Sequence, residues 1–365
     1  MPKKIRSKVS NTVSGTKNFF LGIPRATRNL YKEIPHQVKS FKEWIFTFRG
    51  SLTILCLIGT ILVPLITMDD YIMTILISFL VFSIFAASWD LLAGYTGQVS
   101  FGHSVFFGIG AYVAAAFVKM AGLPWFFSMI IGAVAAILVG LIIGIPCLRL
   151  KGPYLALGTQ AFSLILFNLF MSGELKDILG STEGISALPA MSEAHIVTFF
   201  FILIIMVISF IILTIIVKSN IGTIFKAIRD DETAADASGI NTTKYKLIAF
   251  MISGFFAGIA GGLFALNSRA VNPSVFLALY SFYAIVMVAL GGIATISGSV
   301  VGAFIYWVIL TELFKPMGAL GTIFLYFPTL ISALILIIMI RFADQGILKP
   351  ALEHIREFYD FLLGR

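Results

Sequence analysis

The sequence predicts an all-α polytopic membrane protein with about ten transmembrane helices. Hydrophobic residues make up 59% of the 365-residue chain, charged residues only 12%, and the mean hydropathy is +0.98. Ordinary globular proteins contain about 25% charged residues, and each membrane-spanning helix needs about 20 apolar residues. This composition excludes a soluble enzyme, a disordered chain and an outer-membrane β-barrel, whose strands would alternate apolar and polar residues.

The N-terminal residues 1–50 carry most of the positive charge. They contain eleven Lys or Arg residues and two acids, whereas the net charge of the whole chain is +8. A basic stretch beside a first membrane helix holds the N-terminus in the cytoplasm and against anionic lipid headgroups. We therefore expect residues 1–50 to form a basic cytoplasmic tail that contacts membrane lipid, and we expect no nucleic-acid partner.

The remaining chain is a series of apolar runs, assigned to a transmembrane domain over 51–345 with a cytoplasmic tail over 346–365. The runs lie near 51–67, 71–93, 105–121, 125–147, 154–172, 195–217, 246–266, 277–297, 299–314 and 322–341. The weakest division separates the eighth run from the ninth, where only Gly291, Gly292 and the stretch SGS at 297–299 interrupt the apolar sequence. A count of nine spans therefore stays open.

Positive charge predicts the orientation of these spans. With ten spans and the N-terminus inside, 22 of the 26 Lys and Arg residues are cytoplasmic, which places both termini in the cytoplasm. Two connections are longer than simple turns: an extracytoplasmic loop over 173–194 and a cytoplasmic loop over 218–245. The odd number of spans on each side of 173–194 would give two inverted halves, as in many transporters.

The sequence contains no recognisable catalytic machinery. It has no GxxxxGK[ST] phosphate loop and no Ser-His-Asp, Cys-His or HExxH arrangement. The two cysteines and four scattered histidines offer no metal site. Ion-coupled carriers need buried ionisable residues, but charged residues inside the spans are few, among them the acids Asp90 and Glu312. We therefore predict no enzyme activity, metal or cofactor in this chain, and a translocation pathway powered from outside it.

The segment 89–112 combines glycines with polar residues at a span end. Glycine at this density lets backbones approach closely or breaks a helix, and broken helices line substrate paths. The candidate pathway residues are Gly94, Gly97, Gln98, Ser100, Gly102 and His103. Tight glycine-mediated helix packing after a cytoplasmic turn is the alternative interpretation, and His103 is expected to make a satisfied hydrogen bond rather than to titrate.

The second candidate site is a short helix within residues 223–246. Asp230 or Asp231 can cap its N-terminus, and Gly239 can end it. The pattern also places Ile224, Ile228 and Ala235 on one helical face, and the small residues Ala234 and Ala235 would fit a groove on a partner protein. The candidate residues are Asp231, Glu232, Ala234, Ala235 and Gly239. An ordinary solvated loop is the alternative.

Both segments resemble motifs of permease subunits from branched-chain amino acid ABC importers. AGYTGQVSFGHSVFFGIGAY at 93–112 resembles the membrane motif of that family, and ETAADASGIN at 232–241 resembles its coupling loop. Further similarities are RLKGPYLALGTQAF at 149–162, STEGI at 181–185 and GGIATISGSVVGA at 291–303. The motifs occur in the family's order, and the length resembles that of the longer of two sister permease chains.

The resemblance implies a multi-pass subunit of the prokaryotic cytoplasmic membrane that translocates Leu, Ile and Val. Its implied partners are a sister permease, two cytoplasmic ABC ATPase subunits and an extracytoplasmic substrate-binding protein, with ATP and Mg bound on the ATPases. A permease for urea or short amides is the alternative within this class. A secondary carrier or channel acting alone is the alternative outside it.

Overall fold

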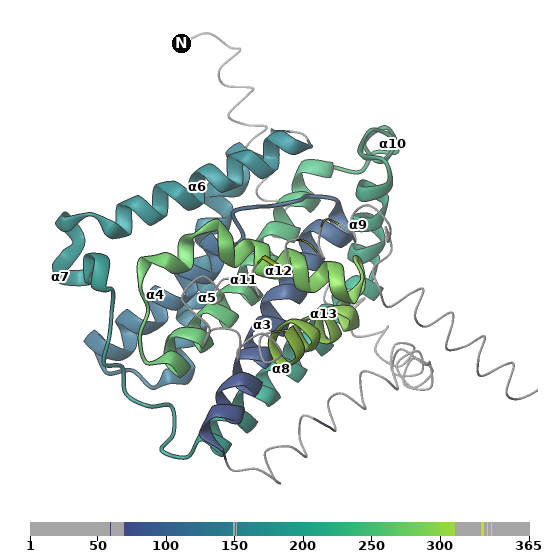
Figure 1. Ribbon diagram of the computed structural model, residues 1–365. Coiled ribbons are helices and arrows are strands. Elements are labelled where there is room, and N and C mark those ends of the chain that lie inside the picture. The colour runs from purple at the N-terminus through teal and green to yellow at the C-terminus, as the bar shows by residue number, and fades with distance from the viewer. Residues whose placement is uncertain are drawn as a thin grey trace, which may run out of the picture. The chain divides into compact units, whose positions relative to one another are not determined.

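The computed structural model describes residues 69–310 except 149 and 151, together with the single positions 59, 330, 331, 334 and 337. All of these belong to one compact unit, Leu52–Arg365. The predicted N-terminal tail and C-terminal tail lie outside the described residues, as do all but a few positions of the predicted spans 51–67 and 322–341. The described part is built from helices (Figure 1).

Six helices in the described part are long and apolar enough to cross a membrane. They are α3 (Asp70–Thr96), α4 (Ser104–Ala121), α5 (Trp125–Cys147), α6 (Pro153–Met171), α8 (His195–Lys218) and α11 (Thr242–Ser268). Each coincides with a predicted span, and their ends differ from the predicted ones by four residues or fewer. The largest difference is at α11, which begins at Thr242 because the Asn241 side chain accepts a hydrogen bond from the Lys244 amide.

The eighth and ninth predicted spans form a bent pair. α12 (Ala278–Gly291) and α13 (Ile296–Phe304), which continues as the π-helical segment η4 (Ile305–Leu310), meet at an angle of 106°. The 14 residues of α12 reach about 21 Å, less than the roughly 30 Å hydrocarbon core. Within the described residues the pair counts as at most one candidate span, so the division into two full spans stays a prediction and the alternative count of nine stays open.

α3 is the central helix of the described part. It is capped at its N-terminus by the Asp69 side chain, which accepts from the Tyr71 amide at 2.9 Å. It packs against α8, α11, α12 and α13 (Figure 1), and 78% of its most apolar stretch is buried. The most apolar stretch of α6 is only 22% buried. α6 therefore lies at the periphery of the unit with one face exposed.

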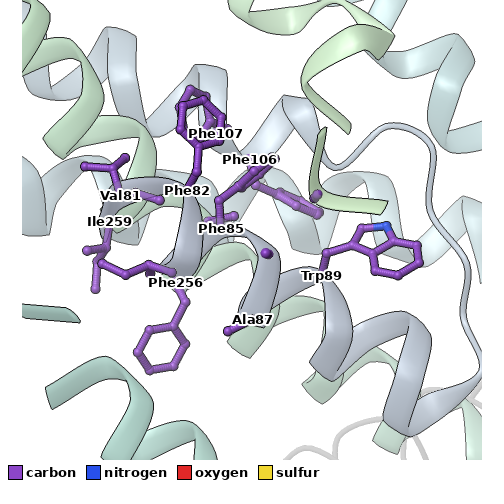
Figure 2. Close-up of a cluster of buried hydrophobic side chains, with 14 of the residues drawn as sticks. Val81, Phe82, Phe85, Ala87, Trp89, Phe106, Phe107, Phe256 and Ile259 are labelled. Carbon is purple, nitrogen blue, oxygen red and sulfur yellow. The ribbon is translucent and has the colours of Figure 1, made fainter. Parts of the chain in front are cut away.

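Glycines bring α4, α5 and α11 into close contact. A methyl group on Gly132 would lie 2.5 Å from the Gly110 carbonyl oxygen, and one on Gly258 would lie 2.8 Å from Ala133 Cα. Such close approach is a main source of helix association in membranes, where burial of apolar surface supplies little driving force. Beside this contact, Phe107 packs with Phe82 and Phe85 at ring-centroid distances of 5.8 and 4.8 Å (Figure 2).

The predicted loop 173–194 contains three short helical segments. These are η1 (Gly173–Leu175), α7 (Lys176–Leu179) and η2 (Ser181–Glu183). Ile185 then forms an antiparallel β-bridge with Val271, which follows α11 and precedes η3 (Pro273–Phe276). Both connections therefore lie together at one end of the bundle.

Candidate functional site

The glycine-rich segment between α3 and α4 turns back into the helix bundle. α3 ends at Gly97, which has a left-handed φ of 70° and donates its amide to the Ala93 carbonyl. The chain then runs back along α3, as the hydrogen bond from the Trp89 indole to the Ser100 carbonyl at 2.9 Å shows. His103 Nε2 lies 2.9 Å from Ser88 Oγ, two helical turns before the end of α3. Consequently α4 begins inside the bundle.

Side chains of two other helices satisfy the non-helical backbone of this segment. Thr159 Oγ1 on α6 accepts the amides of Phe101 at 3.2 Å and Gly102 at 3.3 Å. Ser281 Oγ on α12 accepts the Ser104 amide at 2.8 Å. Irregular backbone at membrane depth is stable only where protein or water satisfies it. The 97–103 segment therefore depends on α6, and the start of α4 depends on α12, for their conformations.

The structure gathers the predicted pathway residues in this one region, and most of them are buried. Gly94, Gln98, Ser100, Gly102 and His103 are buried, whereas Gly97 is exposed. A methyl group on Gly102 would overlap the Thr159 carbonyl, and one on Gly94 would lie 2.7 Å from the Ala294 amide nitrogen. These contacts within the chain are those of close packing. A role along the translocation route stays a prediction.

Two short helices connect α8 to α11, and the second is capped as predicted. α9 (Asn220–Asp230) is followed by α10 (Glu232–Ala237). Asp231 Oδ1 accepts the amides of Thr233 and Ala234 at 2.8 and 3.0 Å. Gly239, with a φ of 85°, ends α10 by donating to the Asp236 carbonyl, while the following Ile240 amide donates to Ala235. This is the Schellman geometry that favours glycine. The predicted cap and stop are confirmed.

The predicted faces of this region require correction. Asp231 is extended, with φ −158° and ψ 107°, so Ile224 and Ile228 do not share a continuous helix with Ala235. Ala235 is only 5% exposed and faces its own chain, whereas Ala234 is exposed. The exposed face of α10 therefore presents Ala234 and not Ala235. The sequence pattern missed this because it treated α9 and α10 as one helix.

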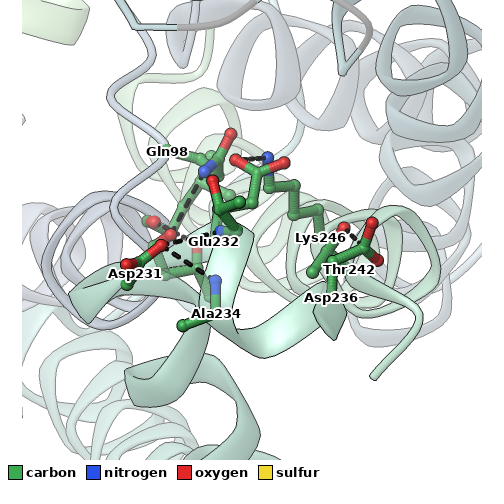
Figure 3. Close-up of polar contacts among 10 residues, drawn as sticks. Gln98, Asp231, Glu232, Ala234, Asp236, Thr242 and Lys246 are labelled. Atoms are coloured by element: carbon green, nitrogen blue, oxygen red, sulfur yellow. Dashed lines mark hydrogen bonds and ion pairs between the residues drawn. The ribbon is translucent and has the colours of Figure 1, made fainter. Parts of the chain in front are cut away.

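Both short helices contact the transmembrane helices through charged side chains. Arg229 Nη1 of α9 donates to the Gly94 carbonyl of α3 at 3.1 Å. Glu232 of α10 forms an ion pair with Lys246 of α11, whose side chain is 3% exposed (Figure 3). Sequence reasoning missed both contacts. The sequence signal for the ion pair was Lys246, a lysine at the first position of the predicted span 246–266.

Comparison with known proteins decides the family of this chain. The family described as the permease component of branched-chain amino acid transport systems matches residues 71–343. The chain belongs to this permease family. The match includes all six candidate membrane helices, the bent pair, and the segments 97–103 and 231–239.

Curated relatives of this permease carry the names of both sister chains. LivM, a high-affinity branched-chain amino acid transport system permease protein, is 27% identical in Escherichia coli and 26% in Salmonella typhimurium. Both matches cover 75% of this chain and 70% of the relative. The probable permease LivH of Methanocaldococcus jannaschii is 28% identical over 66% of this chain and 79% of its own length. No solved structure matches the chain.

Family membership places this permease in a membrane as a multi-pass transport subunit without a catalytic domain. No cofactor is expected in a permease component. The expected likeness to the longer sister is also confirmed, because the LivM proteins of Escherichia coli and Salmonella typhimurium are among the most similar curated relatives. The coverages show that LivM is the longer protein. A match of 306 residues covers 70% of the Escherichia coli LivM, whereas 298 residues cover 93% of LivH from the same species.

Proposed function

We propose that this chain is the membrane-spanning permease of an ATP-driven, binding-protein-dependent importer for leucine, isoleucine and valine. The observation that carries the proposal is the family match over 71–343, joined with the capped, partly exposed helix α10. The partners in this proposal are a sister permease, two cytoplasmic ATPase subunits and an extracytoplasmic binding protein. The matches to both LivM and LivH from Escherichia coli support the pairing of two different permeases.

The proposed orientation places α9 and α10 in the cytoplasm. The predicted distribution of Lys and Arg supports this orientation. In it, the connections joined by the Ile185–Val271 bridge lie outside, where a binding protein would deliver substrate. Both termini are cytoplasmic in the same proposal, and the two halves of the chain are related by inversion.

Within this importer, α10 is the helix that receives the movement of the ATPase. Its exposed surface includes Thr233, Ala234 and Ala237, which are small enough for a groove on the partner to enclose. The caps at Asp231 and Gly239 hold the helix in shape. Arg229 of the preceding helix α9 contacts Gly94 of α3, three residues before the segment 97–103. In this proposal the segment 97–103 borders the translocation route.

The transport proposal is tested by reconstituting the four kinds of subunit in proteoliposomes and measuring uptake of labelled leucine. We expect uptake to require both ATP and the binding protein. Isoleucine and valine should compete with leucine, and urea should not. Leucine uptake that proceeds without ATP would contradict the proposal and favour a carrier acting alone, and competition by urea would favour the amide class.

The coupling proposal is tested in the same preparation with Ala234→Trp. The indole would overfill a close contact with the ATPase, so uptake and substrate-stimulated ATP hydrolysis should both be lost. Ala234→Ser is the matched control, because it keeps a small side chain at the same exposed position, and it should retain uptake and stimulated hydrolysis. Full stimulated hydrolysis in the Ala234→Trp variant would show that α10 does not receive the movement of the ATPase.

A further inference from the structure

Lys246 is a buried charge for which the proposed function has not accounted. It lies on α11, five residues after the Asn241 cap, and its side chain is 3% exposed. Its ion-pair partner Glu232 belongs to α10, and the Glu232 side chain is 36% exposed. Lysine is almost never fully buried unless it is paired. The carboxylate of Glu232 therefore stabilises the charged Lys246 side chain in its buried position.

We propose that the Glu232–Lys246 ion pair transmits the movement of α10 to α11. Glu232 and Lys246 would then be positioning residues that join the coupling helix to the centre of the bundle. This inference rests on the proposed role of α10 as the helix that contacts the ATPase. It identifies α11 as the transmembrane helix that receives the movement. The Glu232 carboxylate and the Lys246 ammonium are the groups that transmit it.

The energetic asymmetry of the pair keeps α10 and α11 together. If the two helices separated, Glu232 could be hydrated, but the Lys246 ammonium would lose its carboxylate partner in a buried position. Breaking a buried pair in this way is strongly unfavourable. Another polar contact between the helices, from Thr242 Oγ1 to Asp236 Oδ1, is long at 3.5 Å. The ion pair is therefore the strong connection, and the two helices should move as one body.

α11 is well placed to pass this movement on. It packs against α3, α4 and α5. One helical turn after Lys246, Phe250 is fully buried and contacts Phe106 at a ring-centroid distance of 6.0 Å. Phe106 in turn contacts His103 at 5.4 Å. Farther along α11, Ser253 donates to the Ser88 carbonyl of α3 at 2.7 Å.

These contacts link Lys246 to the segment 97–103 through a short series of packed side chains. Ser88, which accepts from Ser253 through its carbonyl, also bonds His103 through its hydroxyl. The alternative route runs through α9, where Arg229 contacts the Gly94 carbonyl. The Arg229 side chain also pairs with the exposed Asp230, so loss of the Gly94 contact still leaves it with a charged partner. Lys246 is 3% exposed and is paired with Glu232, so the route through α11 contains the contact that is more costly to break.

The test uses the reconstituted importer with Lys246→Met, Glu232→Gln, the double variant and Lys244→Met. Leucine uptake and ATP hydrolysis are measured together, which gives the leucine transported per ATP. We expect each single variant at the ion pair to lower this ratio at least about fivefold, the lower end of typical coupling between sites. The double variant should be no worse than the singles, because all three lack the same connection.

Lys244→Met is the matched control, since Lys244 is exposed two residues earlier on α11. Its leucine-to-ATP ratio should equal that of the wild type. Lys246→Met is the single variant that should still fold, because it removes the buried charge. Glu232→Gln instead leaves the charge of Lys246 unpaired. Complex assembly is checked by size-exclusion chromatography with all subunits quantified.

Three results would overturn the inference. They are a wild-type ratio for Lys246→Met, single-variant losses that multiply in the double variant, and failure of assembly in place of uncoupling. The last would mean that the pair only holds the structure together. Ala234→Trp separates this outcome from failure of the proposed function. If that variant uncouples transport while Lys246→Met does not, α10 is the coupling helix but acts through another contact. If neither uncouples it, the coupling role of α10 fails as well.

Discussion

Gly102 lies at the closest contact between the 97–103 segment and α6. Its amide donates to Thr159 Oγ1, and a methyl group in place of its hydrogen would overlap the Thr159 backbone carbonyl. Because that carbonyl belongs to a helix, it has little room to move. We predict that Gly102→Ala destabilises the protein by about 1–3 kcal/mol, the usual cost of overpacking.

The measurement is the thermal unfolding midpoint of the purified permease in detergent. Gly173→Ala is the control, since nothing lies within 4 Å of a methyl group at that position, and its midpoint should stay at the wild-type value. Equal midpoints for the two variants would contradict the packing described for Gly102.

At the scale of single elements, α10 depends on its caps because six residues form too short a helix to be stable alone. Asp231→Ala removes the acceptor for two amides, and loss of such a cap costs about 1 kcal/mol. We predict that amide hydrogen exchange over 232–237 becomes about fivefold faster, as this free energy implies.

Asp230→Ala is the neighbouring control for that experiment. The Asp230 carboxylate pairs with Arg229 at the surface, and such pairs contribute little. Its effect on exchange in α10 should therefore be small. Similar acceleration in both variants would show that general loss of acidic charge, rather than the cap, changes the stability of the helix.

The caps of α10 were predictable because capping is local. Asp231 bonds amides two and three residues ahead, and Gly239 supplies a left-handed φ, so both signals are contained in the sequence of the loop. The direction of Ala235 and the partner of Glu232 depend on where α11 lies in space. Neither follows from spacing, because the extended backbone at Asp231 resets the helical phase between α9 and α10.

At the scale of the whole molecule, the proposed topology predicts opposite accessibility for two exposed threonines. Thr182 lies in the predicted extracytoplasmic loop, and Thr243 lies at the start of α11. Cysteines placed at these positions, in a chain without Cys56 and Cys147, should react with an impermeant maleimide from opposite sides of the membrane. Reaction of both from one side would exclude the proposed orientation.

The bent pair makes a separate prediction about the same topology. The Ala294 amide donates to Asp90 Oδ1 at 2.7 Å, one turn before Gly94, whose carbonyl bonds Arg229 of α9. The break between α12 and α13 therefore lies at the α9 end of α3. Ile293 is 48% exposed, and Ile293→Cys should react from the same side as Thr243→Cys. Reaction from the side of Thr182→Cys would place the break at the other end.

Much of the helical framework was predictable, since the length of an apolar run nearly determines a membrane helix. The six long helices match the predicted spans for this reason. The bend between α12 and α13 was visible only as an interruption at Gly291 and Gly292. Its angle is held by Asp90, 204 residues away in the sequence, and the enclosure of 97–103 by Thr159 is likewise a long-range effect.

The dependence of this segment on later helices has a consequence for synthesis. The Ser104 amide finds its acceptor on Ser281, 177 residues downstream. At about 5–20 residues per second, a ribosome needs roughly 9–35 s to reach that point. During this interval the beginning of α4 must be held in the insertion machinery or in water, because lipid cannot satisfy its backbone. We therefore expect the nascent chain to be open to quality-control proteases until α12 arrives.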